Sequence, residues 1–196
     1  MFGFFKKKEE NAQLAAVLYD KILAQSREPD FYQYFGVPDT IQGRFDLLCV
    51  HAFLIVDRLY EDGPKGTKLA QSFFDHMFKE TDKNLRELGI GDLSVPKHIK
   101  KLMRGFKGRS MAYRDAMESD EHYDLIEALM RNLYGTSEKP DEKNACLIAS
   151  YMHETAFILG TTSEEDFIQA DFNFPAMPKK DEEVQSNKTD DPRMVA

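Results

Sequence analysis

The feature that most constrains the fold of this chain is an apolar run from Leu47 to Val56. Only His51 interrupts the run, and no charged residue lies within it. A run of this length is too short to cross a bilayer, which takes about 20 residues, so other parts of the chain must cover it. The surrounding residues follow a helical period. We therefore expect a central helix that runs to about Tyr60 and is apolar on nearly every side.

The start of this central helix has a recognisable signal. Asp39 is a favourable N-cap residue, and Gln42, three residues later, completes a capping-box pattern. The run Glu61-Asp62-Gly63-Pro64 ends the pattern. These signals predict a helix that Asp39 caps and that ends before Gly63.

Helical periodicity extends over nearly all of the chain, and no long segment alternates with the period of a strand. A short aromatic turn is expected at 31–35. The fold class is therefore all-α, with a single compact multi-helix domain of about six or seven helices. Besides the central helix, the pattern predicts helices at about 11–26, 65–88, 120–134 and 142–159. It also predicts a helix that begins near Ser94 and a short helix that Ser163 caps and that reaches about 171.

A chain of 196 residues suits one domain with flexible ends. We expect a flexible N-terminal tip at 1–10, a helical domain at 11–174 and a disordered polar tail at 175–196. Cys49 and Cys146 both lie in apolar helical segments, so both are expected to be small core residues. Two cysteines are too few for a disulfide framework.

The N-terminal tip carries no recognisable targeting signal, because its apolar residues precede its basic ones and residue 2 is not glycine. We therefore expect a cytoplasmic protein. Phenylalanines beside lysines also fit the surface of an anionic membrane, here the inner membrane. The alternative is a frayed helix end. The candidate membrane-contact residues are Phe2, Phe4, Phe5, Lys6, Lys7 and Lys8.

A second basic region lies between Leu93 and Arg114, where seven basic residues and no acidic residue occur. On a helical wheel at ~100° per residue, all of them except Arg109 share one face, provided that the helix continues through Gly105 and Gly108. A break or kink at these glycines is equally compatible with the pattern. We call the shared face the basic stripe; it consists of Lys97, Lys100, Lys101, Arg104, Lys107 and Arg114.

Such a stripe fits RNA phosphates, anionic lipid or an acidic protein surface. The alternative is an ordinary solvated face that pairs with the acidic segment after Asp115. The net charge of −8 argues against a protein that coats nucleic acid, so DNA is not an expected partner.

The sequence contains no constellation typical of an enzyme or a metal site. The histidines lack the spacing of metal motifs, and Cys-x-x-Cys, phosphate-binding and Gly-x-Ser-x-Gly motifs are absent. We therefore expect no catalytic residue, no metal and no cofactor. His51 is expected to be a buried histidine that hydrogen-bonds its neighbours and helps to shape a pocket. Haem ligation by His51 is the alternative.

Several short pieces, in this order, make the chain resemble the ubiquinol–cytochrome c chaperone family, the assembly factors of the cytochrome bc1 complex. The resemblance spans about 29–160 and is strongest to the bacterial members. The pieces are Phe31-Tyr32, Phe35-Gly-Val-Pro-Asp-Thr40, Gly43-Arg-Phe45, His51-Ala-Phe-Leu54, Arg58-Leu59, Leu85-Arg-Glu-Leu-Gly-Ile-Gly-Asp-Leu-Ser-Val-Pro96, Phe106-Lys-Gly-Arg109 and Tyr113.

The resemblance implies a non-catalytic helical domain that binds newly made cytochrome b. Mitochondrial relatives work near the ribosomal tunnel exit with a small partner protein, so a ribosome and a small protein are further implied partners. This chain departs from them in having no tryptophan, and at its start we expect no transit peptide. An RNA- or ribosome-binding module that acts through the basic stripe is the alternative function.

A chaperone for a membrane helix needs an exposed apolar groove. Two sets of residues, together with His51, are candidates to form one. For both sets the alternative is that they fill the core or position a loop. The client-binding candidates are Phe73, Phe74, Met77 and Phe78 on one helix, Phe35, Asp39, Phe45, Arg109 and Tyr113 around the Gly-Val-Pro-Asp-Thr turn, and His51.

Overall fold

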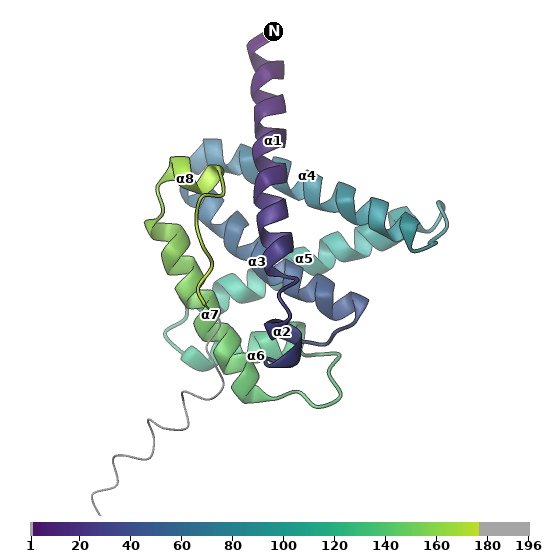
Figure 1. The fold of residues 1–196 in the computed structure, drawn as a ribbon, viewed down its shortest axis with the longest axis vertical. Coiled ribbons are helices and arrows are strands. Elements are labelled where there is room, and N and C mark those ends of the chain that lie inside the picture. Colours follow the sequence, from purple (N-terminus) through teal and green to yellow (C-terminus); the bar gives the residue numbers. More distant parts are fainter. Residues whose placement is uncertain (1, 177–196) are drawn as a thin grey trace, which may run out of the picture.

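The computed structural model describes residues 2–176, and every regular element in that range is a helix (Figure 1). The all-α single domain predicted from the periodicity is confirmed. The four-residue helix α2 lies where we expected only an aromatic turn. The elements are α1 (Phe2–Gln25), α2 (Asp30–Gln33), α3 (Ile41–Glu61), α4 (Gly63–Glu87), α5 (Val95–Glu118), α6 (His122–Asn132), α7 (Glu142–Thr161) and α8 (Glu164–Ile168).

Helix α3 is the centre of the bundle. Every residue from Asp46 to Val56 is buried, and α3 contacts α1, α4, α5 and α7. Helix α1 packs mainly against α4, which it crosses (Figure 1), and α5 packs against α6, which in turn contacts α7. The apolar run is therefore covered by helices from both ends of the chain, as its composition requires.

The expected cap of α3 was wrong by one residue. Thr40, not Asp39, is the N-cap, and its side-chain oxygen accepts a hydrogen bond from the backbone N–H of Gly43 at 3.0 Å. Asp39 instead forms an exposed ion pair with Arg44 at 2.6 Å. Gln42 closes no capping box, because its side-chain amide donates to Asp46 at 2.8 Å.

The crossing of α3 and α4 depends on a residue without a side chain. A Cβ atom at Gly66 would lie 1.8 Å from the carbonyl oxygen of Leu59. This separation is far inside van der Waals contact, so α4 can approach the end of α3 only with glycine at this position.

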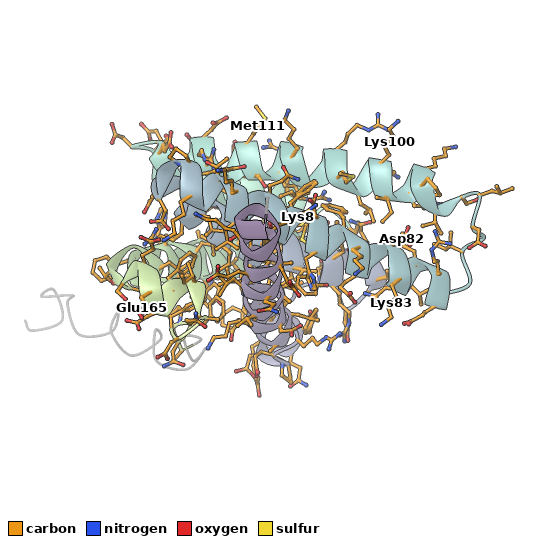
Figure 2. All side chains as sticks on the ribbon, turned by 90° about the horizontal axis from the view of Figure 1, so that it is seen from above. Lys8, Asp82, Lys83, Lys100, Met111 and Glu165 are labelled. Carbon is orange, nitrogen blue, oxygen red and sulfur yellow. The ribbon has the colours of Figure 1, made fainter. Side chains whose placement is uncertain are left out.

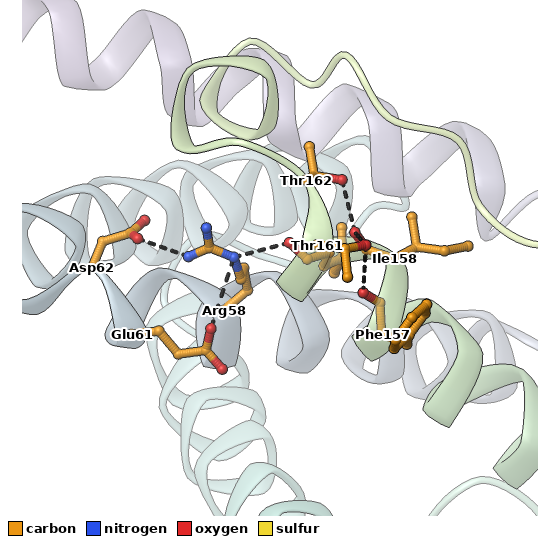
Figure 3. A network of polar contacts seen from close by, with 8 residues as sticks. Arg58, Glu61, Asp62, Phe157, Ile158, Thr161 and Thr162 are labelled. Atoms are coloured by element: carbon orange, nitrogen blue, oxygen red, sulfur yellow. Dashed lines mark hydrogen bonds and ion pairs between the residues drawn. The ribbon is translucent and has the colours of Figure 1, made fainter.

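Arg58 joins the end of α3 to the end of α7 (Figure 3). Its Nε donates to the carbonyl oxygen of Leu159 at 3.0 Å, and its Nη1 donates to Asp62 at 2.8 Å. Its guanidinium also lies over the ring of Phe167 in α8, 5.0 Å from the ring centre. Ser163 caps α8 as predicted, accepting from the N–H of Asp166 at 3.1 Å.

Three further expectations are settled by the structure. Helix α5 is continuous through Gly105 and Gly108, so the predicted basic stripe lies on one helix. Helix α1 begins at Phe2, well before the expected start at Asn11, and its N-terminal end projects from the bundle (Figure 1). Cys49 is buried as expected, but Cys146 is exposed, so its assignment to the core was wrong.

The tail expected to be disordered from Pro175 onward falls mostly outside the described residues. Residues 171–176 are described and have no regular structure. Phe172 and Phe174 in this segment contact each other edge to face, with ring centres 5.5 Å apart. Phe174 lies beside His51, so this end of the chain covers part of α3.

The close approach at Gly66 yields a stability prediction. We expect Gly66→Ala to lower the free energy of unfolding by about 2 kcal/mol, because the new methyl group forces α4 away from Leu59. The matched control is Gly108→Ala. Gly108 lies in α5 with nothing near its Cβ position, so this change should raise stability by about 1 kcal/mol. Urea unfolding of both variants checks the opposite signs.

Candidate functional site

A groove of about 550 Å³ lies between α3, α4 and α5. Its floor is apolar, and we call it the α3–α4–α5 groove. Phe53 and Val56 come from α3, Ala70 from α4 and Phe106 from α5, and all four are buried. The small side chain of Ala70 leaves room between the larger residues of its neighbours.

Aromatic and methionine side chains form the walls of the groove. Phe74 is partly exposed, and its ring lies 4.7 Å from that of Phe78 and 6.0 Å from that of Phe106. Met111 and Tyr60 at the rim are 57% and 48% exposed. Exposed apolar side chains around a concave apolar floor are typical of a surface that binds another apolar molecule.

The rim of the groove on the α5 side is basic. Arg104, Lys107 and Arg114 all line it. Arg114 forms an ion pair with Asp57 at 2.6 Å, and its guanidinium lies 5.5 Å from the ring centre of Tyr60. Arg104 and Lys107 form no ion pair with any other described residue. Two cations at the rim are therefore available to a ligand.

The structure thus divides the basic stripe into two parts. Arg104, Lys107 and Arg114 belong to the groove, whereas Lys97, Lys100 and Lys101 are exposed nearer the start of α5. Figure 2 shows Lys100 and Met111 projecting on the same side of α5, so both parts lie on one continuous face. Arg109 is not part of this face, as the wheel predicted.

Arg109 instead turns toward α3, where it forms an ion pair with Asp46 at 2.6 Å. Asp46 is only 3% exposed. Burial raises the pKa of Asp46 to about 6, while Arg109 and the amide of Gln42 oppose the shift. This pair links α3 to α5 within the bundle, where Arg109 cannot also reach a ligand at the groove.

Of the predicted client-binding residues, Phe74 alone lines the α3–α4–α5 groove. Phe45 is partly exposed and packs against the core, and Asp39 is exposed at the start of α3. Their role in binding a client stays a prediction. The members that are buried in the core are Phe35, His51, Phe73, Met77, Phe78 and Tyr113.

His51 lies at the centre of a satisfied hydrogen-bond network. Its Nδ1 lies 3.0 Å from the carbonyl oxygen of Leu47, which can only accept, so Nδ1 carries the proton. Nε2 then accepts from the hydroxyl of Tyr151 at 2.9 Å, and the Oγ of Ser26 lies 3.1 Å from Nδ1. Burial lowers the pKa of His51 to about 4, which keeps the ring neutral.

Because both ring nitrogens of His51 are engaged, neither is free to bind a haem iron. The rings of Phe31 and Phe174 pack edge-on against the imidazole, with ring centres 5.4 Å away in each case. The described residues also contain no group of three or more His, Cys, Asp or Glu side chains that could hold a metal ion. These contacts favour the structural interpretation of His51.

The predicted membrane-contact tip belongs to the projecting end of α1. Lys7 and Lys8 are exposed, whereas the side chains of 2–6 lie outside the described residues. Contact of this tip with a membrane therefore stays a prediction. Among residues 2–176, no helix combines the length and the apolar character needed to span a bilayer.

Most groove residues escaped the sequence analysis. Phe53, Val56 and Ala70 look like ordinary core residues, because nothing in a sequence pattern shows where three helices leave a gap. Met111 did carry a signal: it is an apolar residue on the same helical face as the basic stripe.

The family model for ubiquinol-cytochrome C chaperones matches residues 33–174. The chain belongs to this family. A solved structure, that of the Cbp3 homolog from Brucella abortus, is similar over 90% of this chain and 97% of its own, with 35% identity and a TM-score of 0.76. All of the groove and the His51 network except Ser26 lie within the matched residues.

Two vertebrate relatives extend the comparison. Ubiquinol-cytochrome c reductase complex assembly factor 1 of Mus musculus is 20% identical over 85% of this chain and 56% of its own length. The Xenopus laevis protein of the same description is 21% identical over 71% of this chain and 68% of its own. The chain thus spans little more than half of the mouse relative.

The buried His51 predicts a specific pH dependence. Its folded pKa of about 4 lies below the usual 6.5, so the unfolded state binds more protons between these values and stability is lost as pH falls through this window. In His51→Gln, we expect this contribution to disappear. The stability advantage of the wild type over the variant should shrink by up to about 1.4 kcal/mol per pH unit as the pH falls from 6.5 to about 4.

Urea unfolding of both proteins at a series of pH values measures this difference. The control is His98→Gln, since His98 is exposed near the start of α5. A wild-type advantage over His51→Gln that is constant with pH would contradict the prediction. The quantity compared is the slope of the stability difference against pH. The hydrogen bonds lost in His51→Gln lower the stability at every pH and therefore do not change this slope.

Proposed function

We propose that this chain is a non-catalytic assembly factor of the cytochrome bc1 complex, and that it binds newly made cytochrome b. The observation that carries the proposal is the apolar α3–α4–α5 groove with its basic rim. The membership of the family and the assembly-factor descriptions of the vertebrate relatives support the same assignment.

The dimensions of the groove suit a helix of the client. Along α5 its lining extends from Met103 to Arg114. At ~1.5 Å per residue this is about 16 Å, or three turns of a bound helix. A helix laid in a groove contacts it through apolar residues at the i, i+3, i+4 and i+7 positions, which a transmembrane segment offers on any side.

The side chains that line the groove suit a client that arrives unassembled. Met103 and Met111 are flexible and polarisable, so they adapt to the irregular surface of a hydrophobic segment. Their flexibility also lets the segment leave when its final partners become available. An assembly factor needs such reversible binding.

The basic rim fits the end of a membrane segment. The last carbonyl groups of a helix carry a partial negative charge, and loops between such helices can carry carboxylates. Arg104 and Lys107, which form no ion pair with described residues, are placed to bind either group. An apolar helix with an anionic end therefore satisfies both parts of the groove.

Filling the groove should block the function. Gln71 is exposed at the α4 edge of the groove, so Gln71→Trp puts a large side chain into the binding space without disturbing the core. In a deletion strain complemented with this variant, we expect membrane cytochrome b, measured as the b-type haem spectrum, to fall about tenfold.

The matched control is Gln13→Trp, which makes the same change at an exposed position of α1 that does not line the groove. It should restore cytochrome b fully. A photo-crosslinker at Met111 should in addition capture newly made cytochrome b. Normal cytochrome b with Gln71→Trp, together with no crosslink from Met111, would refute the groove as the client site.

A further inference from the structure

The turn between α4 and α5, residues 88–94, forms a projecting end of the molecule (Figure 1). It exposes apolar side chains: Leu93 is 99% exposed, Leu88 is 59% exposed and Ile90 is partly exposed. Gly89, with φ of +83°, lets the chain reverse sharply here. Turns of this kind are usually polar, so the apolar side chains require an explanation.

A singly exposed leucine is ordinary on a protein surface. What distinguishes this turn is the set of cations beside it, which we call the tip lysines: Lys97, Lys100 and Lys101. Lys97 follows Leu93 by about one helical turn, and the other two follow by about two turns. All three are exposed, and none forms an ion pair with another described residue.

The acidic residues near the turn offset only part of this charge. Asp92 forms an ion pair with Arg86 at 2.5 Å, and Arg86 also binds Asp82 at 2.6 Å. Glu87 is exposed at the end of α4. From Leu93 to Arg114 the chain has no acidic residue at all, so the cationic side of the turn extends along α5.

We propose that the α4–α5 turn is a membrane contact, in which Leu88, Ile90 and Leu93 enter the interfacial region of an anionic bilayer and the tip lysines bind lipid phosphates. Moving exposed apolar side chains out of water lowers the free energy, and each lysine near an anionic surface adds electrostatic attraction between the protein and the membrane. Neither contact requires a helix that crosses the membrane.

Other partners match only half of this surface. RNA phosphates would bind the tip lysines, but exposed leucines add nothing to such binding. A helix of a protein partner docks in a concave groove, whereas this turn is a convex end. A bilayer accepts a convex apolar tip and supplies anionic groups around it.

The proposal does not depend on the cytochrome b assignment. It does place the α3–α4–α5 groove near the lipid surface, because the same face of α5 carries the tip lysines and the rim of the groove. The proposed contact is separate from the N-terminal tip, which lies on α1.

Flotation of the full-length chain with lipid vesicles tests the contact. We expect binding to vesicles of phosphatidylcholine mixed with anionic phosphatidylglycerol and little binding to phosphatidylcholine alone. Leu93→Glu should lower the partition coefficient about tenfold. The joint substitution Lys97→Glu, Lys100→Glu and Lys101→Glu should lower it about a hundredfold. All four side chains are exposed, so the fold is preserved.

Phe157→Glu is the matched control for Leu93→Glu, because Phe157 is 71% exposed on α7, away from the turn. It should bind vesicles like the wild type. The chain has no tryptophan, so Leu93→Trp supplies a single reporter of the environment of the turn. Its emission should shift to the blue with anionic vesicles and be quenched by brominated lipid, whereas Phe157→Trp should do neither.

Three results would overturn the proposal. The first is that the chain does not bind anionic vesicles. The second is that the lysine substitutions abolish vesicle or RNA binding while Leu93→Glu has no effect, which would indicate a purely electrostatic surface. The third is that Phe4→Glu abolishes vesicle binding while Leu93→Glu does not, which would assign the contact to the N-terminal tip.

Discussion

The need to keep water away from α3 governs the rest of this structure. Its buried stretch presents apolar side chains in all directions, so no single neighbouring helix can cover it. The imidazole of His51 adds a second requirement, because two polar nitrogens in the middle of an apolar helix need partners. The Leu47 carbonyl and Ser26 lie at Nδ1 and Tyr151 on α7 lies at Nε2, so segments far apart in the sequence meet at this ring.

Much of the fold could be predicted because helical period and burial are local properties of the sequence. The errors occurred where a local signal was ambiguous, misleading or absent. Asp39 and Thr40 are both good caps, and only the contact with Gly43 decides between them. Cys146 lies in an apolar segment, but its position on α7 faces away from the neighbouring helices. Residues 6–11 of α1 are all charged or polar, so no apolar period showed that the helix begins at Phe2.

The candidate site was much harder to predict, because a groove forms where the side chains of neighbouring helices leave a space between them. Phe73 and Phe74 are neighbours in sequence, yet the first is fully buried and the second lines the groove. The basic stripe was visible on a helical wheel. Its division was not, because only the packing of α5 against α3 and α4 decides which of its cations line the groove. Contacts between distant segments decide which cations remain available.

The link between Arg58 and Leu159 has a consequence for the order of events during synthesis. These residues are 101 positions apart, as the two ends of the His51–Tyr151 hydrogen bond are 100 apart. A ribosome makes the chain from its N-terminus, so α3 emerges long before the helix that completes its cover. Until α7 has been made, the apolar run of α3 stays partly unprotected. The protein therefore passes through a stage of its own synthesis in which its central helix still needs shielding from water.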